Sequence, residues 1–390
     1  MFNLTSEELK EKQALHTTTE IYQQPEVWRE LTIDFIKYQN DFKKFIESIY
    51  TRHEKTRVIF TGAGTSAFIG DILVPELTKH AGKNVQFEAI ATTDIVSNPK
   101  EYLIDVPTIL VSFARSGNSP ESVATVALSK WIIKDFYQVI ITSNKNGELA
   151  KNCESDDKSL IILTPEKAND QSLAMTSSFS SMILLAYMLF ANSEFSDSFS
   201  KQLITSATHL LDSFEELINE ILDFDFNRVV YLGSGSLAQL AHEAALKMLE
   251  LTAGKVIAIH ESSLGFRHGP KSILNDQSIV VLFMSQDEYT RKYDFDILRE
   301  LAATDSEMKI VALTEKEEKE VESLANWTIP VNVGSKSINS DFQLGLLYIL
   351  FAQTLALTKS KDLGISPDNP SPDGAISRVV QGVTIYEYEE

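Results

Sequence analysis

The stretch Arg57-Val-Ile-Phe-Thr-Gly-Ala-Gly-Thr-Ser-Ala67 joins an apolar run to a glycine turn. Its twin, Arg228-Val-Val-Tyr-Leu-Gly-Ser-Gly-Ser-Leu-Ala238, stands 171 positions later. In both stretches a G-x-G turn follows the apolar run and precedes a helical pattern, which is typical of a strand–turn–helix unit. A unit that occurs twice predicts that the chain holds two copies of one domain.

Two more matches keep the same spacing. Ile109-Leu-Val-Ser-Phe113 returns as Ile279-Val-Val-Leu-Phe283, and Val139-Ile-Ile-Thr142 returns as Val311-Ala-Leu-Thr314. Because the matches are collinear, they indicate an internal duplication of a domain of ordinary α/β size.

Short β-branched runs alternate with helical stretches in each copy. In the first copy we expect strands near 57–61, 85–89, 108–113, 138–142 and 160–163. Their continuous apolar character suits strands that are buried on both faces of a parallel sheet. The predicted fold is α/β: two tandem doubly wound α/β/α sandwiches of flavodoxin-like type, with mainly parallel sheets. Ligands of such sheets bind beyond the carboxyl ends of the strands.

The duplication suggests four segments. They are a helical N-terminal extension, the first domain, the second domain and a C-terminal tail that closes the active site, over residues 1–45, 46–205, 206–360 and 361–390. An amphipathic helix is expected over Trp28–Tyr50. The tail is dense in turn-forming residues over Ser366–Gly374, and the apolar Val383–Tyr386 could return as a strand or lie across a cleft.

Composition narrows the class of partner. The 390 residues carry 35 basic and 55 acidic side chains, a net charge of −20, which argues against a nucleic-acid or anionic-membrane partner. A phosphorylated metabolite stays possible, because backbone N–H groups bind phosphate without a basic patch. The lone Cys153 cannot form an intrachain disulfide, and we give it no role. Met1–Lys12 has no apolar core of a signal peptide and Met182–Ala191 is too short to span a bilayer, so a cytoplasmic protein is expected.

The first candidate loop is Thr61-Gly-Ala-Gly-Thr-Ser-Ala67. Glycines there let the backbone approach a ligand, and a helix N-terminus favours an anion. The pattern is also a loose dinucleotide fingerprint, and Glu88 ends the next strand where a ribose-binding acid would stand. A nicotinamide enzyme is therefore one alternative, and a glycine turn that only packs strand against helix is another.

The second candidate loop carries more hydrogen-bond donors than the first. A strand runs into Ala114-Arg-Ser-Gly-Asn-Ser-Pro-Glu-Ser122, where Ser119 suits the N-cap of a helix and Pro120 its first position. Hydroxyls, N–H groups, the helix dipole and Arg115 together make an anion cradle. The alternative is a capped helix with a solvated arginine.

A helix of the second copy carries three charged residues. Glu243, Lys247 and Glu250 share one face by their spacing, and the residues between them are apolar. In an active-site wall, Lys247 would orient Glu250, which could take a proton from carbon. The alternative is an exposed ladder of salt bridges.

The segment His260-Glu-Ser-Ser-Leu-Gly-Phe-Arg-His-Gly-Pro270 places two histidines in what is expected to be a loop. Either could be an acid–base group or a surface residue. Neither has a third ligand at metal-site spacing, so no metal and no cofactor is predicted.

These features together resemble the sugar isomerase (SIS) family, and the resemblance covers about residues 45–390. The isomerase half of glucosamine-6-phosphate synthase is built from the same parts in the same order. The tail, with Ser366-Pro-Asp-Asn-Pro370 and Arg378-Val-Val-Gln-Gly-Val-Thr-Ile-Tyr386, is similar to one branch. That branch is the galactosamine-6-phosphate deaminase/isomerase group, also called tagatose-6-phosphate ketose/aldose isomerases.

The resemblance implies a role for each matching position. Glu250 matches the base that moves a proton between C2 and C1, and His268 matches the ring-opening histidine, which reaches in from a second subunit. Glu243 and Lys247 match the supporting pair. The expected phosphate contacts are Arg115, Ser116 and Ser119. The expected sugar contacts are Thr65, Ser66, Thr176, Arg378 and Gln381. A homodimer or larger homo-oligomer with shared active sites is expected, with a small sugar phosphate as the ligand.

Two departures from the synthase bear on the reaction. Ala114 stands where the synthase loop carries a serine, and the synthase's near-terminal lysine is replaced in this region by Arg378 or Gln381. The sequence shows no glutamine amide-transfer domain, which favours the degradative direction. The expected reaction is the deamination and isomerisation of galactosamine 6-phosphate to tagatose 6-phosphate and ammonia. A plain aldose–ketose isomerase and a non-catalytic sugar-phosphate sensor are the alternatives.

Overall fold

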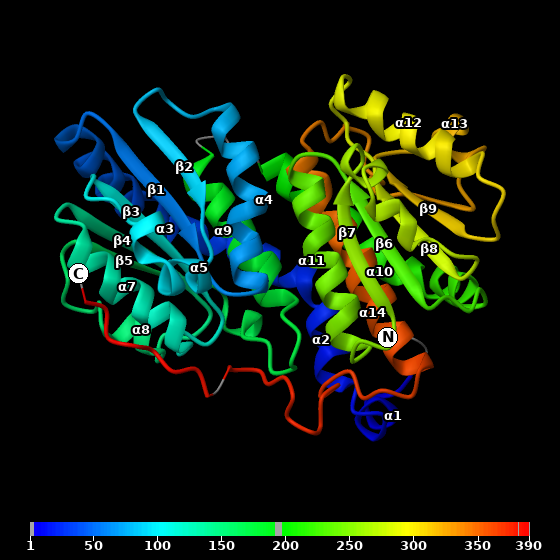
Figure 1. The fold of residues 1–390 in the computed structure, drawn as a ribbon, viewed down its shortest axis with the longest axis horizontal. Coiled ribbons are helices and arrows are strands. Elements are labelled where there is room, and N and C mark those ends of the chain that lie inside the picture. Colours follow the sequence, from blue (N-terminus) through cyan, green and yellow to red (C-terminus); the bar gives the residue numbers. More distant parts are fainter. Residues whose placement is uncertain (1–3, 192–196, 381, 390) are drawn as a thin grey trace. The chain divides into compact units, whose positions relative to one another are not determined.

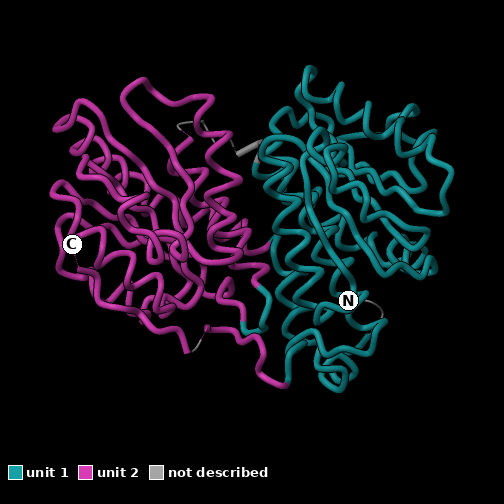
Figure 2. Tube along the Cα trace, in the orientation of Figure 1, with its two compact units in different colours: residues 1–25, 171–174, 196–372 teal, residues 26–170, 175–195, 373–390 magenta. Residues whose placement is uncertain are grey.

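The computed structural model describes residues 4–191, 197–380 and 382–389, and its fold is drawn in Figure 1. The chain forms two compact units, coloured separately in Figure 2. Unit 1 holds residues 1–25, 171–174 and 196–372, and unit 2 holds residues 26–170, 175–195 and 373–390. Each unit therefore contains segments from more than one part of the sequence.

Unit 2 is built on a five-stranded sheet in the order β2-β1-β3-β4-β5, and every neighbouring pair is parallel. The strands are β1 (Thr56–Thr61), β2 (Val85–Ala89), β3 (Thr108–Ala114), β4 (Phe136–Thr142) and β5 (Ser159–Leu163). All five strands predicted for the first copy are confirmed to within two residues; β1, β3 and β4 are buried, and the edge strands β2 and β5 are half-buried.

Unit 1 repeats this sheet. Read from β7, the order is β7-β6-β8-β9-β10, again all parallel. The strands are β6 (Arg228–Gly233), β7 (Ile257–Ser262), β8 (Ser278–Phe283), β9 (Lys309–Thr314) and β10 (Trp327–Pro330). Both sheets have the flavodoxin-like order, so the duplication and the predicted fold class are confirmed.

Helices cover both faces of the sheet in unit 2. One face carries α4 (Thr65–Lys79), α9 (Ser177–Phe190) and most of α3 (Gln24–Arg52), whose Trp28 indole N–H donates to Ser180 at 2.9 Å. The other face carries α5 (Thr92–Ser97), α6 (Pro99–Tyr102), α7 (Pro120–Ile132) and α8 (Glu148–Lys151). The 3₁₀ turn η1 (Glu166–Ala168) precedes α9.

Unit 1 has the same layers. On one face lie α10 (Asp197–Leu222), α11 (Ser236–Leu251) and α14 (Asp341–Asp362), joined by α1 (Ser6–Glu11) and α2 (Leu15–Tyr22). On the other lie α12 (Thr290–Ala302), α13 (Lys319–Glu322) and the turns η2 (Gly265–Arg267) and η3 (Pro270–Ile273). Among the described residues one helix, α14, is long and apolar enough to cross a bilayer, but 94% of its apolar window is buried inside the protein. It is a core helix of this unit.

The start of the tail is bound to α2. The Asp368 carboxylate accepts the backbone N–H groups of His16 at 3.1 Å and Thr17 at 2.7 Å, and it also accepts the Thr17 hydroxyl. On the same helix, buried Glu20 accepts the N–H groups of Gln171 and Ser172 and the Ser172 hydroxyl. These bonds hold the short 171–174 segment and the Ser366–Pro370 motif within unit 1.

The tail then continues in unit 2 without forming a strand. Residues 383–386 are irregular, so the strand alternative predicted for them is wrong. Side chains hold this stretch instead of a backbone ladder: Tyr388 packs edge-on against Trp131 of α7 with ring centroids 5.2 Å apart. The isoleucine and valine side chains of the stretch stay exposed.

The two glycine turns explain why strand and helix meet so closely. A Cβ on Gly62 would lie 2.5 Å from the backbone of Ser66, and a Cβ on Gly233 would lie 2.6 Å from the backbone of Leu237. The second glycines, Gly64 and Gly235, have φ values of 55° and 58° and face open space. The first glycine of each turn thus serves packing, and the second serves backbone conformation.

We therefore expect Gly62→Ala to destabilise unit 2. Backbone atoms of α4 would have to move, at a cost of about 1–3 kcal/mol in the free energy of unfolding. Denaturant titration followed by circular dichroism measures the effect. Gly82→Ala is the matched control, because no atom lies within 4 Å of a Cβ built there. Equal stability of the two variants would contradict the packing role.

Candidate active site

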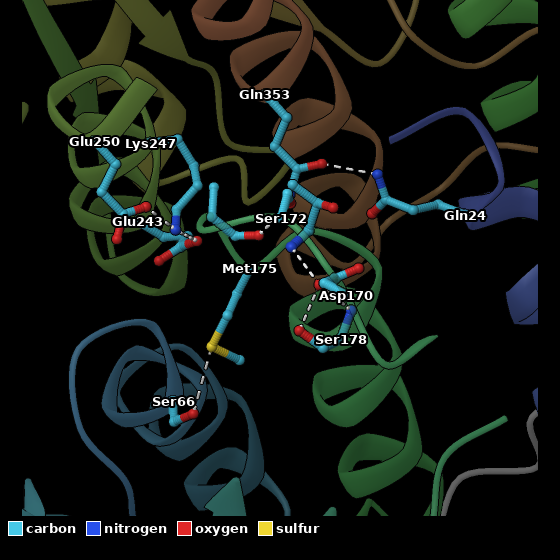
Figure 3. Close-up of polar contacts among 12 residues, drawn as sticks. Gln24, Ser66, Asp170, Ser172, Met175, Ser178, Glu243, Lys247, Glu250 and Gln353 are labelled. Carbon is cyan, nitrogen blue, oxygen red and sulfur yellow. Dashed lines mark hydrogen bonds and ion pairs between the residues drawn. The ribbon is translucent and has the colours of Figure 1, made fainter. Parts of the chain in front are cut away.

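A buried row of charges runs along α11. The Lys247 ammonium lies 3.4 Å from a Glu243 carboxylate oxygen and 2.5 Å from a Glu250 carboxylate oxygen (Figure 3). Glu243 and Lys247 have no exposed side-chain surface, whereas 21% of the Glu250 side chain is exposed. The predicted shared face is confirmed, and the alternative of an exposed ladder is excluded by this burial.

The surroundings of Lys247 keep it charged. Burial alone would lower the pKa of its ammonium group, but the two flanking carboxylates outweigh it and raise the pKa above the usual value. The Lys247 ammonium donates a hydrogen bond to Glu250. The arrangement fixes the orientation of one partly exposed carboxylate, which is what proton abstraction from carbon requires.

The sequence around α11 explains how these charges become buried. The helix begins after Gly235 and ends before Gly254, whose N–H bonds the Leu249 carbonyl at 2.9 Å. Between these ends it packs against β6, β7 and α14. Between the charged positions, Ala244, Ala245 and Met248 are buried in this contact surface, whereas Leu249 is exposed.

The histidines differ from expectation. His260 lies in strand β7, so its prediction as a loop residue is wrong; the apolar run before it continues the strand. Its ring stacks on His242 of α11 with centroids 3.8 Å apart. Burial, with His260 beside it, lowers the pKa of His242 to about 4, and burial also lowers the pKa of His260. His268 is at the end of η2 and is exposed.

In unit 2 the predicted phosphate loop follows β3. Gly117 adopts φ +70°, and a Cβ there would lie 3.2 Å from Gly147. The Asn144 side chain donates to the Ser116 carbonyl at 2.7 Å and so fixes the loop. Helix α7 begins at Pro120 as predicted, but the Ser119 hydroxyl accepts no capping bond from it. The Ser119 hydroxyl thus does not cap the N-terminus of α7.

Arg115 meets the tail at this loop. Its side chain is buried, and its guanidinium donates to the Arg378 carbonyl at 2.7 Å. The guanidinium of Arg378 in turn donates to the Asp170 carbonyl at 2.9 Å and to the Asn169 side chain at 3.0 Å. Two of the predicted ligand-binding residues are therefore brought together, and Gln381 lies outside the described residues.

The predicted sugar contacts of unit 2 lie at two helix starts. Thr65 and Ser66 open α4, and the Ser66 hydroxyl contacts the Met175 sulfur at 3.8 Å (Figure 3). Thr176 is the N-cap of α9, and its buried hydroxyl finds no hydrogen-bond partner in the described part of the chain. Met175 joins these two places and was not predicted, because a methionine before a helix carries no sequence signal.

Asp170 was also missed. Its buried carboxylate accepts the N–H of Thr176 at 2.8 Å, and the N–H and hydroxyl of Ser178 at 2.9 and 2.6 Å. Burial raises the pKa of Asp170, while these hydrogen bonds and the charge of Arg115 act in the opposite direction. An acid placed shortly before a Thr-Ser-Ser helix start was the signal available in the sequence.

The corresponding loop of unit 1 is filled by its own carboxylates. It follows β8, where Asp341 accepts the Ser285 hydroxyl at 2.6 Å and the Gln286 N–H at 2.7 Å. Asp294 accepts the Ser285 N–H at 2.9 Å, and Asp287 accepts the first N–H of α12. An added anion would meet negative charge there, whereas the loop of unit 2 carries the Arg115 guanidinium.

Glu88 is engaged elsewhere. Both of its oxygens pair with the Arg57 guanidinium at 2.6 Å. The acid that a dinucleotide interpretation needs for the ribose is therefore held in a bidentate ion pair between neighbouring strands. Over residues 4–191, 197–380 and 382–389, no cluster of three or more His, Cys, Asp or Glu side chains is arranged to hold a metal ion.

Comparison with known proteins gives consistent matches. The SIS domain model matches residues 52–192 and 224–358. The D-galactosamine-6-phosphate deaminase AgaS of Shewanella sp. (strain ANA-3) is 41% identical, over 99% of this chain and 95% of that protein. The crystal structure of tagatose-6-phosphate ketose/aldose isomerase from Escherichia coli is 37% identical with a TM-score of 0.87, over 96% of this chain and 97% of that chain. A solved structure from Clostridium novyi NT is 40% identical with a TM-score of 0.95, covering 100% and 99%.

Replacing Lys247 tests the buried charge row. Lys247→Met leaves Glu243 buried without its cation, which we expect to lower the free energy of unfolding by about 3 kcal/mol or more. Lys359→Met is the matched control: Lys359 is equally buried, but its partner Asp362 at 3.0 Å is 46% exposed and returns to water. We expect the control to lose about 1 kcal/mol. Urea unfolding measures the free energy of unfolding of both variants. Equal losses in Lys247→Met and Lys359→Met would show that the carboxylates of Glu243 and Glu250 do not depend on Lys247.

Proposed function

The chain belongs to the SIS domain family, and on that premise we propose that it is an enzyme that deaminates and isomerises a hexosamine 6-phosphate. The proposed reaction converts galactosamine 6-phosphate and water to tagatose 6-phosphate and ammonia. The match to the Shewanella deaminase over nearly the full length of both chains supports this assignment. The observation that carries it is the Lys247–Glu250 hydrogen bond on a buried helix, which supplies one oriented base.

The phosphate would be held by the loop after β3. The loop offers the Ser116 and Ser119 hydroxyls, the N-terminus of α7 and the Arg115 guanidinium. Because phosphate is remote from the reacting carbons, this contact would position them without taking part in the chemistry.

Glu250 would carry the proton. After ring opening gives the C1 aldehyde, its carboxylate takes the C2 proton, the C2–H electron pair forms the C1–C2 double bond, and the C1=O pair moves to O1, which takes a proton from water to give an enolamine. Return of the carboxyl proton to C1, with loss of an N–H proton to the hydroxide left from that water, gives an imine at C2. Water adds to C2, the C2–N bond breaks, and ammonia leaves with the ketose phosphate. These steps need an acid–base group and water alone.

The remaining roles follow the same proposal. His268 is exposed on its loop, which suits a residue that assists ring opening in a second copy of the chain. Thr65, Ser66 and Thr176 would contact sugar hydroxyls, and the tail with Arg378 and Gln381 would close over the ligand. The enzyme would work as a homo-oligomer in the cytoplasm on a small metabolite.

Plain isomerisation of a hexose phosphate is the second candidate, because the similar Escherichia coli structure bears the name of a tagatose-6-phosphate ketose/aldose isomerase. The same proton transfer between C2 and C1 would serve both reactions. The two reactions differ in the release of ammonia, so the substituent at C2 of the substrate decides between the two candidates.

Ammonia release is the direct test. We expect purified protein, without added cofactor, to form ammonia and a ketose 6-phosphate from galactosamine 6-phosphate, and less from glucosamine 6-phosphate. A coupled glutamate dehydrogenase assay measures the ammonia. Turnover of tagatose 6-phosphate with no ammonia from either amino sugar would replace the deaminase with the isomerase.

Glu250→Gln tests the base. It keeps the size of the side chain but cannot accept the carbon-bound proton, so kcat should fall by at least about 10²-fold. Glu216→Gln, on an exposed position of α10, is the control and should keep wild-type kcat. Exchange of the C2 proton with solvent deuterium, followed by NMR, should vanish in the Glu250 variant. Undiminished exchange would remove Glu250 from the mechanism.

A further inference from the structure

Asp170 connects the loop after β5, the start of α9 and the tail, which is over 200 positions away. Its carboxylate binds the start of α9 through Thr176 and Ser178 (Figure 3). Its backbone carbonyl accepts both the Nε and Nη2 groups of Arg378, at 2.9 and 2.5 Å. The tail and the start of α9 are thus attached to one residue at the end of the loop after β5.

The predicted phosphate loop after β3 is connected to Asp170 as well. The Arg115 guanidinium donates to the backbone carbonyl of Arg378, and its positive charge acts on the Asp170 carboxylate. The chain of contacts therefore runs from Asp170 to Arg378 and from Arg378 to Arg115. Both guanidinium groups in this chain of contacts donate to protein oxygens, so the position of Arg115 depends on its neighbours.

Because the carboxylate of Asp170 is buried, it depends on its hydrogen bonds. The side chain has no exposed surface, so it must retain its hydrogen bonds to remain in place. A backbone contact alone would tolerate substitution, but a carboxylate that accepts two N–H groups and a hydroxyl does not. An amide at this position would present an NH₂ group to donors.

We propose that Asp170 is a positioning residue for the sugar-phosphate site: its carboxylate sets Thr176, and the same hydrogen bonds hold its backbone carbonyl in place, which anchors Arg378 and, through the Arg378 carbonyl, the Arg115 guanidinium. This inference rests on the proposed function, because it assigns the loop after β3 to phosphate. Asp170 itself does not contact the ligand. It acts through residues that do.

The experiment compares Asp170→Asn with Asp294→Asn. Asp294 is the matched control in unit 1: it is also fully buried, and it accepts the Ser285 N–H and the Ser234 and Ser263 hydroxyls at 2.6–2.9 Å. Both variants lose one buried carboxylate, so both should lose similar thermal stability. Two quantities are measured for each: the Kd of inorganic phosphate by isothermal titration calorimetry, and kcat and KM for galactosamine 6-phosphate.

Asp170→Asn should raise the phosphate Kd and the KM roughly tenfold while kcat changes by less than about threefold, because Glu250 is untouched. Asp294→Asn should leave the phosphate Kd within about twofold of wild type. An unchanged Kd in Asp170→Asn, or equal rises in the two variants, would overturn the positioning role.

Arg378→Gln extends the test to the tail, and because Arg378 is on an irregular segment, its loss does not endanger folding. It should raise the phosphate Kd in the same direction, and the double variant with Asp170→Asn should show less than the product of the two effects. An unchanged Kd in Arg378→Gln would break the proposed link through the tail. Phosphate binding without any ammonia release by the wild type would overturn the proposed function alone, whereas a wild type that binds no phosphate would overturn this inference.

Discussion

The Lys247 ammonium between Glu243 and Glu250 is the constraint on which unit 1 depends. A lysine without exposed surface is tolerated only if nearby carboxylates balance its charge, and a buried Glu243 is tolerated only if that lysine stays protonated. The helix that carries them must therefore pack as it does, against β6, β7 and α14. Burying this row of charges is unfavourable, but it leaves one carboxylate, that of Glu250, oriented and partly exposed.

The duplication explains how one fold came to hold two different strand-end loops. Both units keep the same strand order and the same close glycine turn, since a Cβ at Gly62 or Gly233 would collide with the following helix. The loops after β3 and β8 have diverged in charge. One presents a buried arginine and the Ser116 and Ser119 hydroxyls, while the other is closed by Asp294 and Asp341. Packing thus keeps the two units alike in architecture, and the charge of a few side chains makes the two loops differ in the ligands that they could bind.

Local patterns were enough to predict the strands of the first copy, the twin domain and the shared face of Glu243, Lys247 and Glu250. These features repeat with the period of a strand or a helix, so they leave a signal in a short window of sequence. The bonds of Asp170, Glu20 and Asp368 have no such period. Asp368 binds the start of α2 some 350 positions away, and Asp170 meets Arg378 from over 200 positions away. The prediction of a loop at His260 was wrong for a related reason: one histidine does not end a strand whose other face is apolar.

The polar contacts that escaped prediction share a physical purpose. Each places a carboxylate, buried in Glu20 and Asp170 and half-buried in Asp368, where two or three segments meet, and each accepts backbone N–H groups there. Glu20 and Asp368 do this for the segments that leave unit 1, and Asp170 does it for the loop, helix and tail of unit 2. Apolar packing can fix a helix on a sheet, but it cannot specify the path of an irregular tail. In this chain, that path is specified by directional hydrogen bonds of the Asp368 carboxylate and of the Asp170 backbone carbonyl, and the Arg115 guanidinium in turn bonds the tail.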